Sequence, residues 1–264
     1  MSLILLAGGK SSRINTDKAF LKFKDKTIIE NTINALKNIF DEIIIVANNN
    51  LERYNSIIKK YNKTITLKID LIKNKGPLGG IYTGLKTAKD SNNFILACDM
   101  PFINADLIKY MLKFNDFDAV VPRVNDKIEP LYAVYNKNII PIIEKQIKNN
   151  NLKIRDAIKK LKKTKYIGKE EIEKFDKEGI CFLNINNYED LERAKGLIEN
   201  KKEKYVKICS QCGSTHIKIP PAGMDIRMTM PDYCTKCGNR GIFPEVKEDK
   251  IEEFGHDLEK SKKK

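Results

Sequence analysis

Two segments near the N-terminus carry groups suited to binding an anionic ligand. Residues 6–13 (LAGGKSSR) follow an apolar run, and Asp17-Lys18 comes shortly after them. Glycines let backbone N–H groups approach a phosphate, while Lys10, Arg13 and Lys18 add positive charge. The spacing is that of neither a Walker A loop nor a G-x-G-x-x-G loop. Taken alone, this segment is a phosphate site or an ordinary turn.

Two further segments add chemistry of the same kind. Residues 76–80 (GPLGG) precede a predicted helix over 81–89. They either bind an anion at the N-terminus of this helix or form a tight turn between a strand and the helix. Asp99, in residues 98–102 (CDMPF), follows the most apolar predicted strand. A carboxylate at the carboxyl end of a strand is placed to hold Mg²⁺, and the alternative is an Asp that caps the next turn.

Four of the six cysteines form two C-x-x-C pairs, Cys209/Cys212 and Cys234/Cys237, with 21 residues between the pairs. Four thiolates in this arrangement suit tetrahedral Zn²⁺, and the alternatives are a redox dithiol or a chance pairing. Gly213 and Gly238 follow the second cysteine of each pair, where the backbone must turn back towards the metal. The sequence therefore predicts a structural zinc ribbon.

The elements that position these groups alternate between strand and helix patterns. Apolar β-branched runs predict strands, and amphipathic stretches between them predict helices. The expected strands are 3–7, 42–47, 64–69, 93–98, 118–122, 131–135 and 180–185; the expected helices are 28–40, 81–89, 104–114 and 188 to about 199, with Asn104 and Asn187 as N-caps. This alternation predicts an α/β fold with a mainly parallel sheet and helices on both faces.

Taken together, residues 6–18, 76–80 and 98–102 resemble the molybdenum cofactor guanylyltransferase family in order and spacing, and the resemblance extends over about residues 2–200. Residues 129–132 (EPLY) resemble the family's pterin-side loop, and residues 182–190 (FLNINNYED) resemble its closing Asn-x-Asn-Thr-Pro-Glu-Asp motif. The resemblance implies a Rossmann-like nucleotidyltransferase fold. It also implies transfer of GMP from GTP to the phosphate of a molybdopterin-type cofactor carrying molybdenum or tungsten, with release of pyrophosphate.

The resemblance further implies roles for individual residues. Asp99 is expected to bind the nucleotide and Mg²⁺, and Lys18 and Arg13 to offset phosphate charge. Nucleotide contacts are implied for Leu6, Ala7, Gly8, Gly9, Lys10, Lys18 and Asp70, and pterin contacts for Asn184 and Asn186. The chain departs from the family where Asn187-Tyr188 replaces Thr-Pro. Val46 stands where some members have an Asn, and Asn48 is a nearby substitute.

Other functions fit the same residues. Similar loops would serve cytidylyl transfer to the same cofactor, or guanylyl transfer to a phospholactate or a cobinamide. A different class is a zinc-ribbon factor that binds nucleic acid or protein. The net charge of +14 permits a nucleic-acid partner, but residues 201–264 hold only 14 basic against 10 acidic residues. We therefore expect GTP and the pterin cofactor as partners, a partner protein on the ribbon, and no nucleic acid.

The composition also sets the domain organisation. We expect a nucleotidyltransferase domain over 1–200, a zinc ribbon over 201–246 and a charged tail over 247–264. Between the two cysteine pairs lies an insert, residues 217–230, which contains two prolines and three methionines. Because methionine side chains adapt to varied surfaces, this insert is a candidate contact for a partner, and the alternative is packing onto the ribbon itself. No apolar run is long enough to span a bilayer, and the short first run is too short for a secretory signal, so we expect a cytoplasmic protein.

Overall fold

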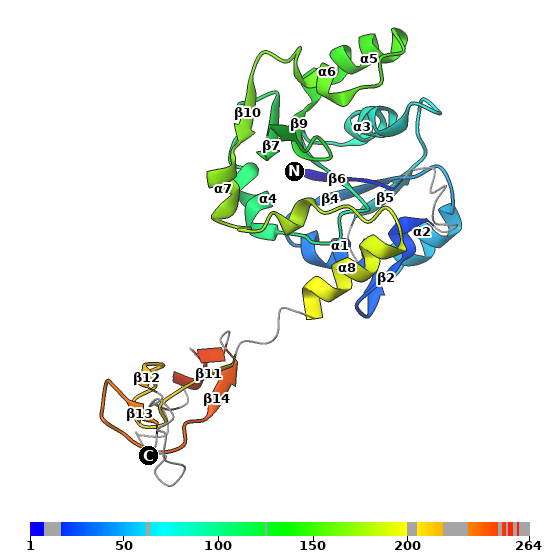
Figure 1. Cartoon of the computed structure of the whole chain (residues 1–264). Coiled ribbons are helices and arrows are strands. Elements are labelled where there is room, and N and C mark those ends of the chain that lie inside the picture. Colours follow the sequence, from blue (N-terminus) through cyan, green and yellow to red (C-terminus); the bar gives the residue numbers. More distant parts are fainter. Residues whose placement is uncertain are drawn as a thin grey trace. The chain divides into compact units, whose positions relative to one another are not determined.

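The computed structural model describes residues 1–7, 17–61, 64–124, 126–199, 205–218, 232–247, 250, 251, 253–255 and 258. The chain forms two compact units, Met1–Lys195 and Gly196–Lys264, and each is described by itself (Figure 1). No helix in the described part of the chain is long and apolar enough to cross a membrane.

The larger unit is built on a sheet in which eight described strands take part. Its strands are β1 (Ser2–Leu6), β4 (Glu42–Val46), β5 (Ile65–Lys68), β6 (Asn92–Ala97), β7 (Ala119–Val124), β8 (Lys127–Ile128), β9 (Tyr132–Asn136) and β10 (Thr164–Ile167). Their order is β10-β7-β9-β6-β1-β4-β5, and β8 pairs with β7. Strand β9 runs antiparallel to β6 and β7, whereas β1, β4, β5 and β6 pair in parallel. The predicted mainly parallel sheet is therefore confirmed.

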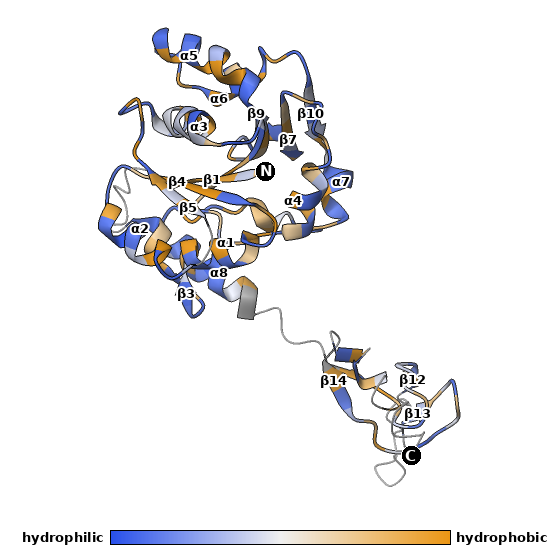
Figure 2. Cartoon of the chain, turned by 180° about the vertical axis from the view of Figure 1, so that it is seen from behind, coloured by the Kyte–Doolittle hydropathy of each residue, from blue (hydrophilic) through white to orange (hydrophobic). Residues whose placement is uncertain are grey.

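Helices cover both faces of this sheet (Figure 1). They are α1 (Ile28–Leu36), α2 (Leu51–Ile58), α3 (Gly76–Thr87), α4 (Ala105–Met111), α5 (Ile140–Lys148), α6 (Ile154–Ile158), α7 (Lys169–Glu173) and α8 (Tyr188–Glu199). Alternate residues of each strand face opposite layers: Leu3 and Leu5 pack with α1, α2 and α4, while Ile4 packs with α3, α5 and α6. Apolar residues accordingly lie on the inner sides of the helices (Figure 2).

Local sequence explains where several helices begin. Thr27 and Glu30 form a reciprocal capping box at the start of α1. The Asn104 side chain accepts a hydrogen bond from Leu107 N at 2.9 Å, which confirms it as the cap of α4. Gly84 lets α3 lie against β1, because a Cβ at this position would be 2.3 Å from Ile4 Cγ2.

Two sequence predictions of local structure are wrong. The run 180–185 was expected to be a strand, but Ile180–Phe182 is a 3₁₀ helix, η3, entered through Gly179 in the left-handed region at φ 65°. An apolar run alone therefore does not decide whether a strand forms; the end of this run is instead attached to the segment after β6, because Ile185 N donates to Asp99 O at 2.8 Å. Residues 76–80 do not precede their helix but begin it, since α3 starts at Gly76 with Pro77 in its first turn, where a missing N–H costs nothing.

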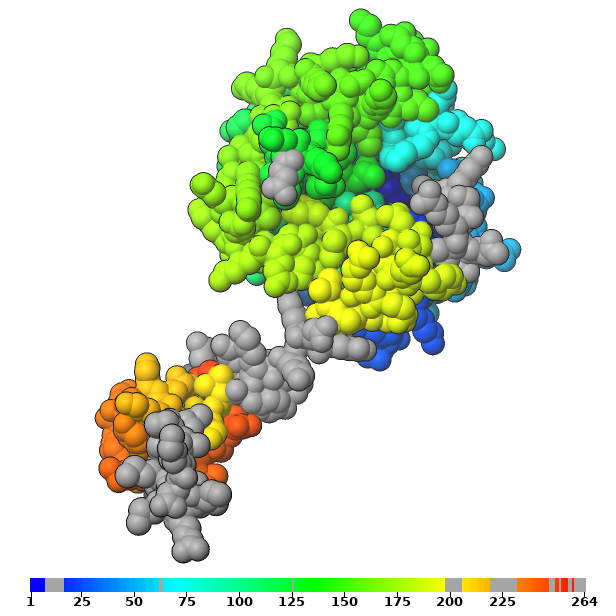
Figure 3. Space-filling model, in the orientation of Figure 1, coloured from blue at the N-terminus to red at the C-terminus, as the bar shows by residue number. Residues whose placement is uncertain are grey.

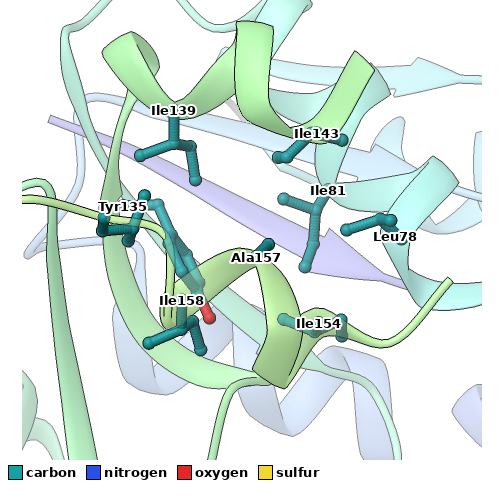
Figure 4. Close-up of a pocket in the computed structure, with 9 residues that line it drawn as sticks. Leu78, Ile81, Tyr135, Ile139, Ile143, Ile154, Ala157 and Ile158 are labelled. Atoms are coloured by element: carbon teal, nitrogen blue, oxygen red, sulfur yellow. The ribbon is translucent and has the colours of Figure 1, made fainter. Parts of the chain in front are cut away.

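The helix α3 also borders a small apolar cavity with α5, α6 and the end of β9. Its lining residues are Leu78, Ile81, Tyr135, Ile139, Ile143, Ile154, Ala157, Ile158 and Leu161. Figure 4 shows these side chains gathered between the helices, and both Ala157 and Ile81 are almost fully buried. The cavity is far too apolar to suggest a phosphate or metal site.

The smaller unit contains two short antiparallel pairs. Strand β11 (Tyr205–Lys207) pairs with β14 (Glu245–Lys247), and β12 (Ile217–Lys218) pairs with β13 (Tyr233–Cys234). Its buried centre consists of Cys209, Cys234 and Phe243. So small a core provides little stability by itself. The remainder of the predicted insert, 219–230, lies outside the described residues.

Candidate active site

The candidate site lies at one edge of the larger unit's sheet. Strands β1, β4, β5 and β6 are parallel, so their carboxyl ends meet at this edge. Ala7 follows β1, Asn48 follows β4, Asp70 follows β5 and Asp99 follows β6. In an open α/β sheet, ligands bind beyond the carboxyl ends of the strands. The topology therefore gathers polar groups from distant parts of the sequence at one edge.

A lysine links two of the predicted site residues. Lys18 Nζ is 3.3 Å from Asp99 Oδ2 and donates a hydrogen bond to Asn186 Oδ1 at 2.8 Å. The side chains of Lys18 and Asp99 are 20% and 27% exposed, so the pair lies in a partly covered position open to a ligand. The structure thus brings the predicted nucleotide side and the predicted pterin side together at one ammonium group.

Backbone contacts hold Asp99 at this edge. Cys98 N donates to Leu6 O at 3.0 Å, which continues the pairing of β6 with β1, and Ile185 N donates to Asp99 O at 2.8 Å. The second bond attaches the segment that carries Asn184 and Asn186 to the end of β6. That segment and α8 lie at the surface of the larger unit (yellow-green to yellow in Figure 3).

Side-chain caps position the other two members of the contact. Asp17 caps the 3₁₀ helix η1 (Lys18–Phe20), because its Oδ1 accepts from Ala19 N at 3.2 Å. Asn187 accepts from Asp190 N at 2.7 Å, as the sequence predicts for the cap of α8. Asp190, however, accepts from Asn186 N rather than from Asn187 N, so its carboxylate fixes the backbone of Asn186 itself.

A second polar pair lies at the ends of β4 and β5. Asn48 Nδ2 donates to Asp70 Oδ2 at 2.8 Å, and Asp70 N donates to Asn48 Oδ1 at 3.2 Å. Asp70 Oδ1 is buried and has no hydrogen-bond partner within the described part of the chain. A Cβ on Gly80 would lie 3.7 Å from this oxygen. Val46, which stands where some family members have an asparagine, is buried in β4. The nearby amide that contacts Asp70 is that of Asn48.

Of the remaining predicted site residues, three lie in the described part of the chain and four do not. Leu6 ends β1 and Ala7 is buried beside it. Asn184 is exposed, and no side-chain hydrogen bond joins it to Lys18 or Asp99 among the described residues. Four predicted residues lie outside the described residues: Gly8, Gly9, Lys10 and Arg13.

Sequence reasoning missed Tyr54, and it gave Glu129 only as part of the segment that resembles the family's pterin-side loop. Tyr54 is fully buried in α2, and its hydroxyl donates to Asp17 Oδ2 at 2.8 Å. None of the motifs or elements expected from the sequence included Tyr54. Glu129, in the predicted pterin-side segment, is half-buried, and this burial raises its pKa while Arg155 and Lys127 oppose the rise. No spacing rule distinguishes either residue from an ordinary structural one.

The smaller unit carries a second candidate site, formed by the four cysteines. The Sγ atoms of Cys209, Cys212, Cys234 and Cys237 all lie within 4.8 Å of one another. Cys209 and Cys237 are 3.6 Å apart, as are Cys212 and Cys234, so each close contact joins one C-x-x-C pair to the other. These distances are too long for a disulfide.

The two C-x-x-C turns have matching backbones. Gly213 N donates to Cys209 O at 2.8 Å and Gly238 N to Cys234 O at 2.9 Å. Both glycines have positive φ, 71° and 76°, as expected where the chain folds back towards the sulfur atoms. Burial raises the pKa of Cys209, but N–H groups of Cys212 and Gln211 outweigh it and lower that pKa to about 6. This turn therefore favours a thiolate at Cys209, whereas at Cys237 the N–H group of Asn239 is outweighed by burial and by hydrogen bonding to the other cysteines, which raise the pKa of Cys237 to about 12.

Comparisons with known proteins agree with this geometry. The sequence matches the MobA-like NTP transferase domain over residues 3–164. A probable molybdenum cofactor guanylyltransferase of Peptoclostridium acidaminophilum is 37% identical over 209 residues, which cover 76% of this chain and 91% of the relative. The molybdenum cofactor guanylyltransferase of Syntrophotalea carbinolica is 36% identical over 196 residues, covering 73% and 89% respectively.

A solved structure has the same fold. The molybdopterin-guanine dinucleotide biosynthesis protein A of Archaeoglobus fulgidus superposes with a TM-score of 0.65 at 27% identity, covering 76% of this chain and all of that one. The sheet order, the polar edge and the extent of these matches lead to one conclusion: the chain belongs to the MobA-like NTP transferase family.

Proposed function

We propose that this chain transfers GMP from GTP to the phosphate of a molybdopterin-type cofactor, carrying molybdenum or tungsten, and releases pyrophosphate. Relatives named for guanylyl transfer match most of the larger unit, which supports the choice of base and acceptor. The observation that carries the proposal is the contact of Lys18 with both Asp99 and Asn186. It puts a cation between the groups expected to bind the two substrates.

The proposed reaction requires little covalent chemistry from the protein. An oxygen of the acceptor phosphate attacks the α-phosphorus of GTP, a new P–O bond forms, and the bond to pyrophosphate breaks. Because two anions must meet, positioning and charge neutralisation dominate the barrier. Among the described residues, Lys18 contacts Asp99 and Asn186, and both are partly open to solvent, so we expect its ammonium to be available to phosphate oxygens. Arg13, which lies outside the described residues, is expected to offset phosphate charge as well.

The residues present also fit a magnesium ion. Mg²⁺ prefers one or two carboxylates together with phosphate oxygens and water. Asp99 offers a carboxylate that is 27% exposed, at the edge where the nucleotide phosphates are expected. When bound, the ion would supply Lewis-acid stabilisation of charge on the phosphates. The side chain of Lys18 orients the same carboxylate through its contact with Oδ2.

Replacing the acidic group tests this site. We expect Asp99→Asn to lower turnover with GTP, Mg²⁺ and molybdopterin cofactor by about 100–1000-fold, the range for loss of one charge-stabilising group. Asp106→Asn is the matched control, because Asp106 is 75% exposed on α4 and pairs with Lys109 on the same helix. GMP transfer by Asp99→Asn at a rate near that of the wild type would overturn the assignment of Asp99.

Substrate competition tests the choice of base and acceptor. Pyrophosphate release is measured with GTP, CTP, ATP and UTP, each with molybdopterin cofactor, a phospholactate or a cobinamide phosphate. We expect release with GTP and the pterin cofactor. Faster release with CTP would indicate cytidylyl transfer. Faster release with a phospholactate or a cobinamide phosphate would indicate that the chain transfers the nucleotide to that acceptor and not to the pterin cofactor.

We further propose that the four cysteines bind one structural Zn²⁺. A tetrahedral site with Zn–S bonds of about 2.3 Å separates its sulfur atoms by roughly 3.8 Å. The 3.6 Å separations of Cys209 from Cys237 and of Cys212 from Cys234 fit this geometry. The small buried core of the unit needs such a ligand for stability.

Metal analysis of the purified chain tests the zinc proposal. We expect about one Zn²⁺ per chain, loss of the metal in Cys212→Ser, and retention in Cys181→Ser, whose thiol is buried in the larger unit. Cysteines that are oxidised to disulfides, or a chain that retains no zinc, would contradict the proposal.

We infer that the zinc ribbon contacts a partner protein. Ile242 is fully exposed beside the buried Phe243, which favours an apolar contact. Lys207 pairs with Asp232, and this pairing lowers the charge available to a polynucleotide. We expect single-stranded DNA to bind weakly at all salt concentrations; strong, steeply salt-dependent binding would overturn this inference. Comparing GMP transfer by the full chain and by residues 1–200 shows whether the ribbon takes part in catalysis.

A further inference from the structure

We propose that Tyr54 is a positioning residue that holds Ala7 and Lys18 in a fixed relation at the active site. This inference rests on the proposed function of the site. Tyr54 Oη lies 2.8 Å from Asp17 Oδ2 and 3.3 Å from Ala7 O. Ala7 is the residue after β1, and Asp17 immediately precedes Lys18. One hydroxyl therefore joins two points that are ten positions apart in the sequence.

The direction of the hydrogen bonds defines what this hydroxyl does. A phenol has one proton to donate, and both neighbours, a carboxylate and a carbonyl oxygen, are acceptors. The shorter distance and the negative charge favour donation to Asp17, with the Ala7 carbonyl as the second acceptor of a shared proton. Burial and the nearby Asp17 raise the pKa of Tyr54, so the hydroxyl keeps this proton at neutral pH.

Asp17 passes the constraint on to Lys18. Its Oδ1 accepts from Ala19 N at 3.2 Å and caps η1, the short helix that begins with Lys18. Its Oδ2 accepts from Tyr54 and, at 3.3 Å, from Asn50 Nδ2. Both carboxylate oxygens are thus engaged, one by the lysine-bearing helix and one by α2. Lys18 in turn reaches Asp99 and Asn186.

The ring of Tyr54 is itself held rigidly. The side chain is fully buried, and its ring lies 4.5 Å from the ring of Phe20, the last residue of η1. The guanidinium of Arg53 covers the Phe20 ring at 4.1 Å. The aromatic contact therefore supports the same short helix that Asp17 caps, and the hydroxyl adds the polar connection to Ala7. A donor with so little freedom is suited to positioning.

The test removes only the hydroxyl group. In Tyr54→Phe we expect the affinity for GTP, measured calorimetrically with Mg²⁺ and without acceptor, to fall about tenfold, the effect of losing one hydrogen bond to a charged group. Tyr110→Phe is the matched control, because Tyr110 Oη donates to Glu171 Oε1 at 2.7 Å away from this site. Both variants lose a hydrogen bond from a tyrosine to a carboxylate, but only Tyr54→Phe should bind GTP more weakly.

A second variant keeps the proposal falsifiable. Asp17→Asn should also weaken GTP binding about tenfold, and the double variant Tyr54→Phe/Asp17→Asn should bind GTP no more weakly than either single variant, because both changes break one connection. GTP affinity in Tyr54→Phe equal to that in Tyr110→Phe, or effects that multiply in the double variant, would overturn the proposal. If the wild-type chain binds CTP in place of GTP, the proposed guanylyl transfer is wrong. The role of Tyr54 is then tested by measuring the affinity of the same variants for CTP.

Discussion

Replacing Gly84 by alanine should destabilise the larger unit although alanine is the better helix former. The new Cβ would lie 2.3 Å from Ile4 Cγ2, 2.9 Å from its Cδ1 and 3.1 Å from its Cγ1, whereas ordinary contacts begin near 3.4 Å. Helix α3 must therefore move by about 1 Å, because Ile4 is fully buried in β1 between two paired strands. Overpacking of this kind costs about 1–3 kcal/mol, and the helix propensity of alanine recovers about 1 kcal/mol.

The net loss, up to about 2 kcal/mol, is measured by urea unfolding followed by far-UV circular dichroism, which reports mainly on the helices of the larger unit. Gly196→Ala in α8 is the matched control: a Cβ there meets nothing within 4 Å, so we expect a gain of up to about 1 kcal/mol. In an Ile4→Ala background, which removes all three contacting atoms, the penalty of Gly84→Ala should disappear. An equal penalty in both backgrounds, or stabilisation by Gly84→Ala alone, would refute the reasoning.

Three further changes test other parts of the fold. Thr27→Ala removes the capping box of α1 and should lower the free energy of unfolding by about 1 kcal/mol in the same assay. Hydrogen bonds from Lys60 and Thr27 lower the pKa of Glu30 from 4.5 to about 2. The stabilisation that they give is therefore present above pH 4.5 and is lost as the pH falls towards 2. Glu30→Gln should flatten the fall in the free energy of unfolding over that range, and an unchanged pH profile would contradict this expectation. Ala157→Val adds two methyl groups to the apolar cavity and should raise the melting temperature, whereas a lower value would show that the cavity cannot accept them.

The central strands of the sheet could be predicted because they are short and continuously apolar, whereas β8 and β10, which contain lysine, were not expected. Residues such as Ile43, Ile44 and Ile45 are buried on both faces of the sheet, and this pattern is hard to mistake when amphipathic helices lie between the runs. The run from Ile180 to Ile185 is also apolar but contains Asn184 and follows Gly179, whose positive φ leads into the 3₁₀ helix η3 instead of a strand. Apolar composition marks a segment as partly buried but does not decide whether it pairs with a sheet.

The candidate site could be predicted in part for a similar reason. Asp99 and Asp70 directly follow apolar strands, so the parallel topology alone places them at one edge. The contact between Lys18 and Asn186 and the hydrogen bond from Tyr54 to Asp17 join segments whose separation no local pattern encodes. The strongest local signal in the chain was the two C-x-x-C pairs, and the structure brings their four sulfur atoms together.

The bond between Lys18 and Asn186 spans 168 positions of the chain. During synthesis, a nascent chain shorter than 186 residues already contains β1, β6 and Asp99 but lacks the amide that meets Lys18. The complete edge thus forms only after nearly the whole larger unit has left the ribosome, since such distant contacts are made late in folding.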